Sequence, residues 1–199
     1  MASVDELKSL VSAKQGFARS NQFLVELPSI GGISASEMNI LCTRVSLPSK
    51  QILTADRRIG MEFEKVAYGY AVDDVAMSFY LLNDYGPRKY FDAWRNIVLD
   101  EETLEVGYKI DYERPVKIHQ LRRPFGNISS NFGPINLSAA IGGGTAYSIE
   151  LLNAFPTTIQ AVDFSNELDG LLEVSVQLSY TNWKRIGASQ NFVNFNLSI

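Results

Sequence analysis

One stretch near the C-terminus, residues 172–183, alternates between apolar and polar side chains over most of its length. The apolar members are Leu172, Val174, Val176, Leu178 and Tyr180, and the polar members between them are Glu173, Ser175, Gln177, Ser179 and Thr181. A period of two places the two sets on opposite sides of a β-strand, whereas a helix would scatter them around its surface. We therefore expect a strand of the main sheet, with its apolar face on the core and its polar face toward solvent or another subunit.

Segments with a similar alternation recur along the chain, and we expect further strands at residues 22–27, 39–47, 61–70, 74–82, 114–121 and 146–153. One helix is predicted at residues 87–99, where Pro87 suits a first helical turn. Its apolar face would be the aromatic stripe of Tyr90, Phe91 and Trp94. The elements predict a mainly β fold with one flanking helix (α+β), in the form of a β-sandwich or barrel.

A chain of 199 residues suits a single domain, which we expect to span residues 1–199. Four segments are expected to extend beyond its core, namely an N-terminal arm (1–21), an extended arm or hairpin (47–70), an insertion loop (122–145) and a C-terminal tail (187–199). In the N-terminal arm, Ser3 and Glu6 have the spacing of a capping box, which predicts a short helix at residues 3–13. The insertion is rich in Gly, Ser and Asn and reads as a loop that can hold a short hairpin. The tail is apolar and should pair with a sheet edge of its own or a neighbouring chain.

The arm at residues 47–70 carries many charged side chains, including Lys50, Arg57, Arg58, Glu62 and Glu64. A segment with this many charges is unsuited to the chain's own core. Two interpretations follow, a solvated loop or a contact with another subunit.

The composition argues against several classes of function. The formal net charge of −4 disfavours nucleic-acid binding through a net basic surface. The single cysteine, Cys42, permits no internal disulfide, and the single histidine, His119, has no catalytic or metal-ligating partner in the sequence pattern. Residues 142–145 are not a phosphate-binding loop, because the required lysine is missing. The acidic run at 100–102 is typical of a solvated turn. We expect no enzyme, no cofactor, no bound metal and no membrane-spanning segment.

Five segments in this order, residues 38–54, 65–80, 83–94, 152–160 and 171–183, resemble tail tube proteins of contractile-tailed, T4-like bacteriophages. The helix segment opens with Asn-Asp-Tyr-Gly-Pro at residues 83–87, and the closing strand carries Gln-Leu-Ser-Tyr-Thr-Asn-Trp at 177–183. The resemblance covers roughly residues 15–185.

The resemblance implies a structural virion protein, assembled in the host cytoplasm, whose hexameric rings stack into the inner tube of a contractile tail. Sheets from six subunits would join into one continuous inner β-barrel around a lumen. The implied partners are further copies of the chain, the tail sheath protein, baseplate and tail terminator proteins, and, inside the lumen, the tape measure protein and DNA without sequence-specific binding. A closed ring of strands would also remove the sheet edges that an isolated subunit exposes.

Within such a tube, we expect the 47–70 arm to extend the inner barrel and contact the next ring. Its apolar members would supply buried area, and its charged members would fix the register. The predicted inter-subunit contacts are Leu47, Ile52, Leu53, Arg57, Arg58, Met61, Glu62, Phe63, Glu64 and Val66. The 122–145 insertion is expected outside the tube, as a surface decoration or a sheath contact.

Two alternatives remain open at this point. A tube-initiating or baseplate protein of the same fold would cap the tube rather than fill it. A β-sandwich module for glycan binding would use exposed aromatic side chains such as Tyr68, Tyr70 and Tyr147 to stack on sugars. Each of these tyrosines lies in a patterned strand, which favours packing in a sheet.

Overall fold

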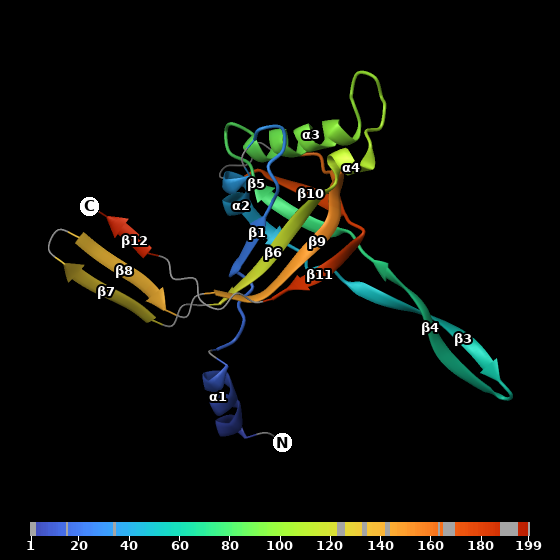
Figure 1. The fold of residues 1–199 in the computed structure, drawn as a ribbon, viewed down its shortest axis with the longest axis horizontal. Helices are drawn as coiled ribbons and strands as arrows, with labels where there is room; N and C mark the ends of the chain where they lie inside the picture. The colour runs from blue at the N-terminus through green and yellow to red at the C-terminus, as the bar shows by residue number, and fades with distance from the viewer. Residues whose placement is uncertain are drawn as a thin grey trace. The chain divides into compact units, whose positions relative to one another are not determined.

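The computed structural model describes residues 3–14, 16–33, 35–122, 126–132, 135–141, 144–162, 164, 170–187 and 195–198. A seven-stranded sheet has the strand order β1–β6–β9–β10–β5–β2, and β11 also pairs with β9 (Figure 1). Its strands are β1 (Phe23–Glu26), β2 (Cys42–Val45), β5 (Val75–Tyr80), β6 (Arg114–Arg122), β9 (Gly144–Ile159), β10 (Glu173–Ser179) and β11 (Asn182–Ile186).

Two smaller sheets and four helices complete the described elements. A three-stranded sheet has the order β12–β8–β7, and a two-stranded sheet pairs β3 with β4. These strands are β3 (Lys50–Ile59), β4 (Glu62–Val72), β7 (Gly126–Phe132), β8 (Ile135–Ile141) and β12 (Phe195–Ser198). The helices are α1 (Val4–Ala13), α2 (Ser36–Leu41), α3 (Gly86–Val98) and α4 (Lys109–Tyr112).

The chain divides into two compact units. The larger unit consists of residues 25–117 and 150–184, and the smaller unit consists of residues 1–24, 118–149 and 185–199. The larger unit contains the helix α3, the hairpin β3–β4 and most of the buried apolar side chains. In the smaller unit, α1 has the predicted capping box, with both the Ser3 and the Glu6 hydrogen bonds formed, and it buries no residue.

Strand β10 lies between β9 and β5 and supplies the centre of the core. Val174, Val176 and Leu178 are fully buried, as the alternation predicted. The expected strand at 172–183 is divided in two, because regular pairing stops at Ser179 and resumes in β11. At this break the backbone N–H of Thr181 donates to the carbonyl of Leu152, so both halves follow the same long strand β9.

Helix α3 packs its aromatic stripe against the sheet, as predicted. Tyr90, Phe91 and Trp94 are fully buried, and the ring of Phe91 lies 5.1 Å from that of Phe79 on β5, measured between centroids. The Tyr90 hydroxyl donates to the carbonyl of Pro28 at 2.6 Å, and burial raises the pKa of Tyr90, so the hydroxyl stays protonated as a donor. These contacts satisfy the polar group of a buried aromatic residue while filling the core.

The predicted strand at residues 39–47 is wrong in its first part, because residues 36–41 form helix α2 and the strand begins at Cys42. The helical turn places Met38 in the core, close to Gly86 at the start of α3. It also lets the side-chain oxygen of Asn39 accept the backbone N–H of Leu27 at 3.1 Å. The periodicity of a short apolar run does not distinguish a helix from a strand. Here the tertiary contacts of Met38 and Asn39 favour the helix.

Strand β9 is longer than the predicted segment 146–153 and continues to Ile159. Asn153 has a φ of +57°, a conformation that asparagine tolerates better than most residues. Burial changes phase there, from Ile149 and Leu151 before it to Ala154 and Pro156 after it. Pro156 lies opposite Leu178, where the register with β10 shifts, and such irregular positions accept a residue without an N–H.

The stretch 122–145, where we expected an insertion loop, contains the regular hairpin β7–β8. Its pairs run from Gly126↔Ile141 to Phe132↔Ile135. The short hairpin that we expected this Gly-, Ser- and Asn-rich segment to be able to hold is therefore present. The predicted pairing of the C-terminal tail with a sheet edge is confirmed, because β12 pairs with residues 136–139 of β8 in the same chain.

Replacing Phe91 with alanine should lower the free energy of unfolding by about 3–5 kcal/mol, because it removes a buried ring and leaves a cavity against Phe79. Urea unfolding followed by circular dichroism measures the loss. Lys89→Ala is the matched control, since Lys89 is exposed on the same helix, and it should change the value by less than about 0.5 kcal/mol. Equal effects of the two substitutions would contradict the assignment of the α3 stripe to the core.

Candidate assembly surface

The hairpin β3–β4 is a long two-stranded ribbon that projects from the strands of the larger unit (Figure 1). Its paired residues run from Lys50↔Val72 to Ile59↔Glu62. At roughly 3.4 Å per residue, the ten residues of β3 extend about 34 Å. Gly60 has a φ of +65° and Met61 does not have a positive φ, which is the pattern of a type II′ turn with glycine in the first central position.

The hairpin exposes large apolar side chains. Met61 at the turn is 95% exposed and Phe63 is 71% exposed. The other exposed apolar side chains of the hairpin are Ile52, Ile59, Val66, Tyr68 and Tyr70. An isolated two-stranded ribbon is marginally stable in water, and clustered exposed apolar side chains mark protein contact sites. The ribbon therefore has the character of a surface that another chain covers.

Each predicted contact residue has a defined place relative to this ribbon. Leu47 is exposed but precedes β3, and Leu53 is half-buried opposite Gly69. The remaining predicted contacts all lie on the hairpin and are exposed, namely Ile52, Arg57, Arg58, Met61, Glu62, Phe63, Glu64 and Val66. The structure thus gathers nine of the ten on one element, with Leu47 just outside it.

The strand register divides the hairpin into two faces of different charge. The Phe63 face carries Lys50, Ile52, Thr54, Asp56 and Arg58 with Phe63, Lys65, Tyr70 and Val72. The Glu64 face carries Gln51, Leu53, Ala55, Arg57 and Ile59 with Glu62, Glu64, Val66, Gly69 and Ala71. Three cations and one anion give the Phe63 face a net charge of +2, whereas one cation and two anions give the Glu64 face −1. The two faces therefore favour different partners.

A polar and aromatic cluster around Lys50 holds the base of the hairpin. The Lys50 ammonium donates to the side-chain oxygen of Asn182 at 2.8 Å. It lies 4.8 Å from the ring centroid of Tyr70 and 5.3 Å from that of Trp183. Cation–π contacts at this range are each worth about 0.5–1 kcal/mol at exposed sites. The cluster, which we call the Lys50 joint, connects the hairpin to β11.

Strand β11 is in turn attached to β9. Lys184 of β11 and Glu150 of β9 form an ion pair at 2.7 Å in which the carboxylate is largely buried. Next to the joint, the hydroxyl of Ser49 donates to the carboxylate of Asp73, which closes the base of the ribbon from the other side. The direction in which the hairpin leaves the sheet is thus set by side chains as well as by the chain itself.

The potentially reactive side chains of His119 and Cys42 lie in structural environments. His119 Nδ1 lies 2.8 Å from the hydroxyl of Ser148. Burial raises the pKa of the Cys42 thiol to about 11, so the reactive thiolate is scarce near neutral pH. Within the described ranges there is no group of three or more His, Cys, Asp or Glu residues that could hold a metal ion. Over the same ranges, no helix combines the length and the hydropathy that crossing a bilayer requires.

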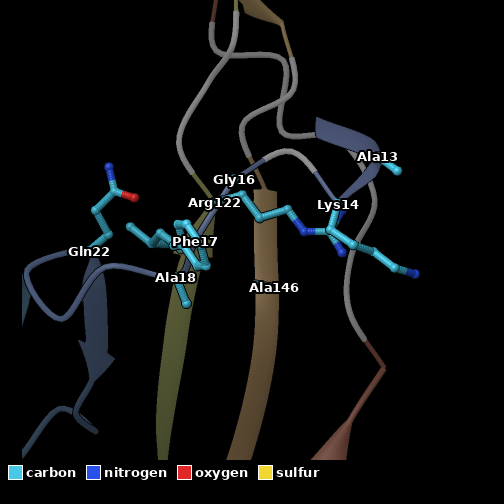
Figure 2. Close-up of a pocket in the computed structure, with 9 residues that line it drawn as sticks. Ala13, Lys14, Gly16, Phe17, Ala18, Gln22, Arg122 and Ala146 are labelled. Atoms are coloured by element: carbon cyan, nitrogen blue, oxygen red, sulfur yellow. The ribbon is translucent and has the colours of Figure 1, made fainter. Parts of the chain in front are cut away.

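The smaller unit contains a shallow pocket near α1, shown in Figure 2, with a volume of about 360 Å³. Lys14, Phe17 and Arg122 are among its lining residues. Lys14 and Arg122 are exposed side chains, and the lining residues include no Ser, Thr, Cys, His, Asp or Glu. Its composition is that of a surface depression and supplies no catalytic chemistry.

The tyrosines proposed for sugar stacking are partly occupied by cations. Lys50 lies over the ring of Tyr70, and Arg185 lies over the ring of Tyr147 at 5.2 Å. Tyr68 is exposed at the irregular position of β4, where the hairpin register shifts. The rings of Tyr70 and Tyr147 are therefore not open platforms on which a glycan could stack.

Comparison with known proteins identifies the kind of protein that presents this surface. The family model described as "Phage tail tube protein" matches residues 7–186. The chain belongs to the phage tail tube protein family. It is therefore a structural tail component, and the predictions of this family and of a non-enzymatic role are confirmed. No curated protein matches the sequence.

Solved structures share the fold of this tail tube protein at low sequence identity. A chain of the anti-feeding prophage baseplate, determined with six-fold symmetry, has 16% identity and a TM-score of 0.56, covering 86% of this chain and 96% of its own. A chain of the sheath–tube complex of the extracellular contractile injection system PVC, in its extended state, has 15% identity and a TM-score of 0.54, covering 94% and 100%. A chain of the sheath/tube terminator of that system has 13% identity and a TM-score of 0.53, covering 85% and 96%.

The Lys50 joint was not predictable from the sequence. Lys50 and Asn182 are separated by 132 positions, and no local pattern connects a lysine at the start of one strand with an Asn–Trp pair in another. The available signal was weaker, namely a lysine in an otherwise patterned strand and a tryptophan at the end of the 172–183 alternation.

Replacing Lys50 with methionine should loosen the direction of the hairpin without unfolding the protein, because it removes the hydrogen bond to Asn182 and both cation–π contacts. Spin labels at Met61→Cys and Lys89→Cys, in a Cys42→Ser background, report the distance from the hairpin turn to α3 by pulsed electron paramagnetic resonance. The distance distribution should broaden in the Lys50→Met protein.

Lys65→Met is the matched control, since it removes the same charge from the same face away from the joint. Its distance distribution should equal that of the background protein. An unchanged distribution in Lys50→Met would show that the joint does not orient the hairpin.

Proposed function

We propose that this tail tube protein fills the inner tube of a contractile phage tail, in hexameric rings that stack through the hairpin β3–β4. The observation that supports this most directly is the exposure of the hairpin's apolar side chains, with Met61 and Phe63 the most exposed of those predicted as contacts. Full burial of one such side chain is worth about 1.5–3 kcal/mol. Stacking would bury several per subunit.

The edges of the large sheet support lateral association into rings. Strands β1 and β2 are the two ends of the strand order, so among the described residues each has one edge without a neighbouring strand. Exposed edges invite pairing with another chain, and closure into a barrel removes them. In our proposal the sheets of six subunits join at these edges and form a continuous inner barrel.

The polar face of β10 suits the lumen of such a barrel. Ser175, Gln177 and Ser179 are uncharged, and the hydroxyl of Ser175 lies 3.0 Å from that of Ser78 on the neighbouring strand β5. Fixed cations would pair with DNA phosphates, whereas hydroxyl and amide groups offer no such charge. We propose that DNA and the tape measure protein occupy this lumen without sequence-specific binding.

In the stacked tube, the predicted contacts of the hairpin and of Leu47 beside it divide into two roles. Leu47, Ile52, Leu53, Met61, Phe63 and Val66 supply buried apolar area, and Arg57, Arg58, Glu62 and Glu64 fix the register between rings. Arg57 lies directly opposite Glu64 in the ribbon, an arrangement of opposite charges that stabilises a strand pair. This pair thus helps to hold the two strands together before another subunit covers the ribbon.

The remaining partners follow from the proposed place of the tube in a virion assembled in the host cytoplasm. Similar folds occur in a sheath–tube complex, a sheath/tube terminator and a baseplate, which supports sheath, terminator and baseplate proteins as partners of this chain. We further propose that the β7–β8 hairpin lies outside the tube. The alternative role, a tube initiator, is favoured by the similarity to a baseplate chain. Copy number per particle separates the two, because an initiator occupies one ring and a filler occupies many.

Removing the outer part of the hairpin tests the stacking role. Residues 54–68 are replaced by an Asn-Gly turn, which closes the ribbon beyond the Leu53↔Gly69 pair. The shortened protein should fold, with an unfolding temperature close to that of the full chain, but should form no tubes in negative-stain electron microscopy. The full chain should form hollow tubes under the same conditions.

Met61→Leu is the control for general damage to the hairpin, because it retains an apolar side chain of similar volume at the turn. It should form tubes at the same protein concentration as the full chain. Normal tubes from the shortened protein would refute stacking through β3–β4.

A further inference from the structure

A second exposed apolar surface lies in the larger unit, on the segment that follows α3. We call residues 99–110 the apolar loop. Four of its large apolar side chains are at least 70% exposed, namely Leu104 at 72%, Val106 at 70%, and Tyr108 and Ile110 at 82%. The sequence pattern drew attention only to the acidic residues of this segment, and the tube function proposed above does not use it.

The apolar loop is held in one conformation by its own backbone. Asp100 donates its N–H to the carbonyl of Glu105 at 3.1 Å, and Leu104 donates to the carbonyl of Asp100 at 3.0 Å. The carboxylate of Asp100 accepts the N–H groups of Glu102 and Thr103, and these hydrogen bonds lower its pKa. A surface that is already ordered loses less conformational entropy on binding.

The end of the loop is fixed to α3 by a close backbone approach. The N–H of Gly107 donates to the carbonyl of Val98 at 2.9 Å. A Cβ at position 107 would lie 2.4 Å from the carbonyl oxygen of Ile97, so only glycine fits there without a shift of the backbone. The apolar side chains at 104–110 are therefore displayed from a rigid support.

Leu104 gives a specific reason to look for a partner. Its φ is +57°, a left-handed conformation that is unfavourable for a bulky side chain. Glycine or asparagine would fit this backbone better, and the leucine side chain is mostly in solvent. Neither local conformation nor burial within the chain accounts for leucine at this position.

We propose that the apolar loop of one subunit receives the Phe63 face of the hairpin of a second copy of the chain. Both surfaces present large apolar side chains, Leu104, Val106 and Tyr108 on the loop and Ile52, Phe63 and Tyr70 on the hairpin. The inference rests on the proposed stacking of subunits, and it identifies the surface on which the hairpin docks.

The net charges of the two hairpin faces favour the Phe63 face as the one that docks on the apolar loop. Four anions and one cation give residues 99–110 a net charge of −3, opposite in sign to the +2 of the Phe63 face. The Glu64 face, at −1, would be repelled. Complementary charge around an apolar centre provides the register and suppresses wrong pairings.

Charge reversal with rescue tests the docking in full-length protein. Arg58→Glu should raise the concentration needed for tube formation by at least about tenfold, because it places an anion against the acidic loop. Adding Glu102→Arg should bring that concentration back to within about threefold of the original chain. Sedimentation and negative-stain electron microscopy measure both effects.

Glu37→Arg is the matched control for the rescue, since Glu37 is exposed on α2 in the same unit and receives the same change in charge. Combined with Arg58→Glu, it should not restore tubes. Rescue by Glu37→Arg as strong as rescue by Glu102→Arg would overturn the pairing and would indicate an effect of net charge.

Leu104→Asn provides an independent test that a folding defect cannot imitate. Asparagine tolerates the positive φ, so the subunit should unfold at the same or a higher temperature than the original chain. Tube formation should nevertheless require a several-fold higher concentration, because an apolar contact is lost. Unchanged assembly of Leu104→Asn would overturn the proposal and would leave the loop for a different protein of the tail.

The outcomes separate this inference from the proposed function. If the original chain forms tubes and neither Arg58→Glu nor Leu104→Asn affects them, the docking site is wrong and the tube function stands. If the original chain forms neither rings nor tubes and sedimentation equilibrium finds no self-association, the proposed function fails, and the docking proposal fails with it.

Discussion

The packing of α3 against the sheet is the contact on which the other features of the larger unit depend. Phe91 meets Phe79 of β5, and Tyr90 is anchored to the carbonyl of Pro28, so one face of the sheet is closed by the chain's own helix. The polar residues of β10 are left on the other face, and no strand in the described part of the chain pairs with the outer edges of β1 and β2. A subunit built in this way has a complete core and open sheet edges, which are available for pairing with other chains.

The hairpin β3–β4 also leaves groups uncovered, in this case apolar side chains rather than strand edges. Its apolar side chains are uncovered within the described part of the chain, and a ribbon of this kind gains little stability from its own two strands. The Lys50 joint compensates by fixing the base of the ribbon to β11, and β11 is attached to β9 through the largely buried carboxylate of Glu150. The orientation of the hairpin is thus determined inside the subunit, while its apolar side chains stay exposed. A ribbon that is already ordered loses less conformational entropy when a partner binds.

The elements that are determined by a local pattern of residues were predictable from the sequence. The alternation of β10, the aromatic stripe of α3 and the Ser3–Glu6 capping box each produced the expected element. The α2 turn and the change of phase at Asn153 were missed because tertiary contacts and a single unusual φ decide them. The β7–β8 pairing was anticipated only as a short hairpin that the insertion can hold. The exposure of the 47–70 arm was predictable from its charged residues, whereas the Lys50 joint and the display of apolar side chains at 104–110 require the fold.

Hydrogen–deuterium exchange of the hairpin amides, compared between unassembled subunits and assembled particles, measures the central claim most directly. In free subunits residues 52–70 should exchange fast, because the ribbon is solvated on both faces. If rings stack through the hairpin, its amides should become strongly protected in tubes, while the amides of β10 stay protected in both states. Tubes in which residues 52–70 exchange as fast as in free subunits would contradict the claim that β3–β4 is the stacking element.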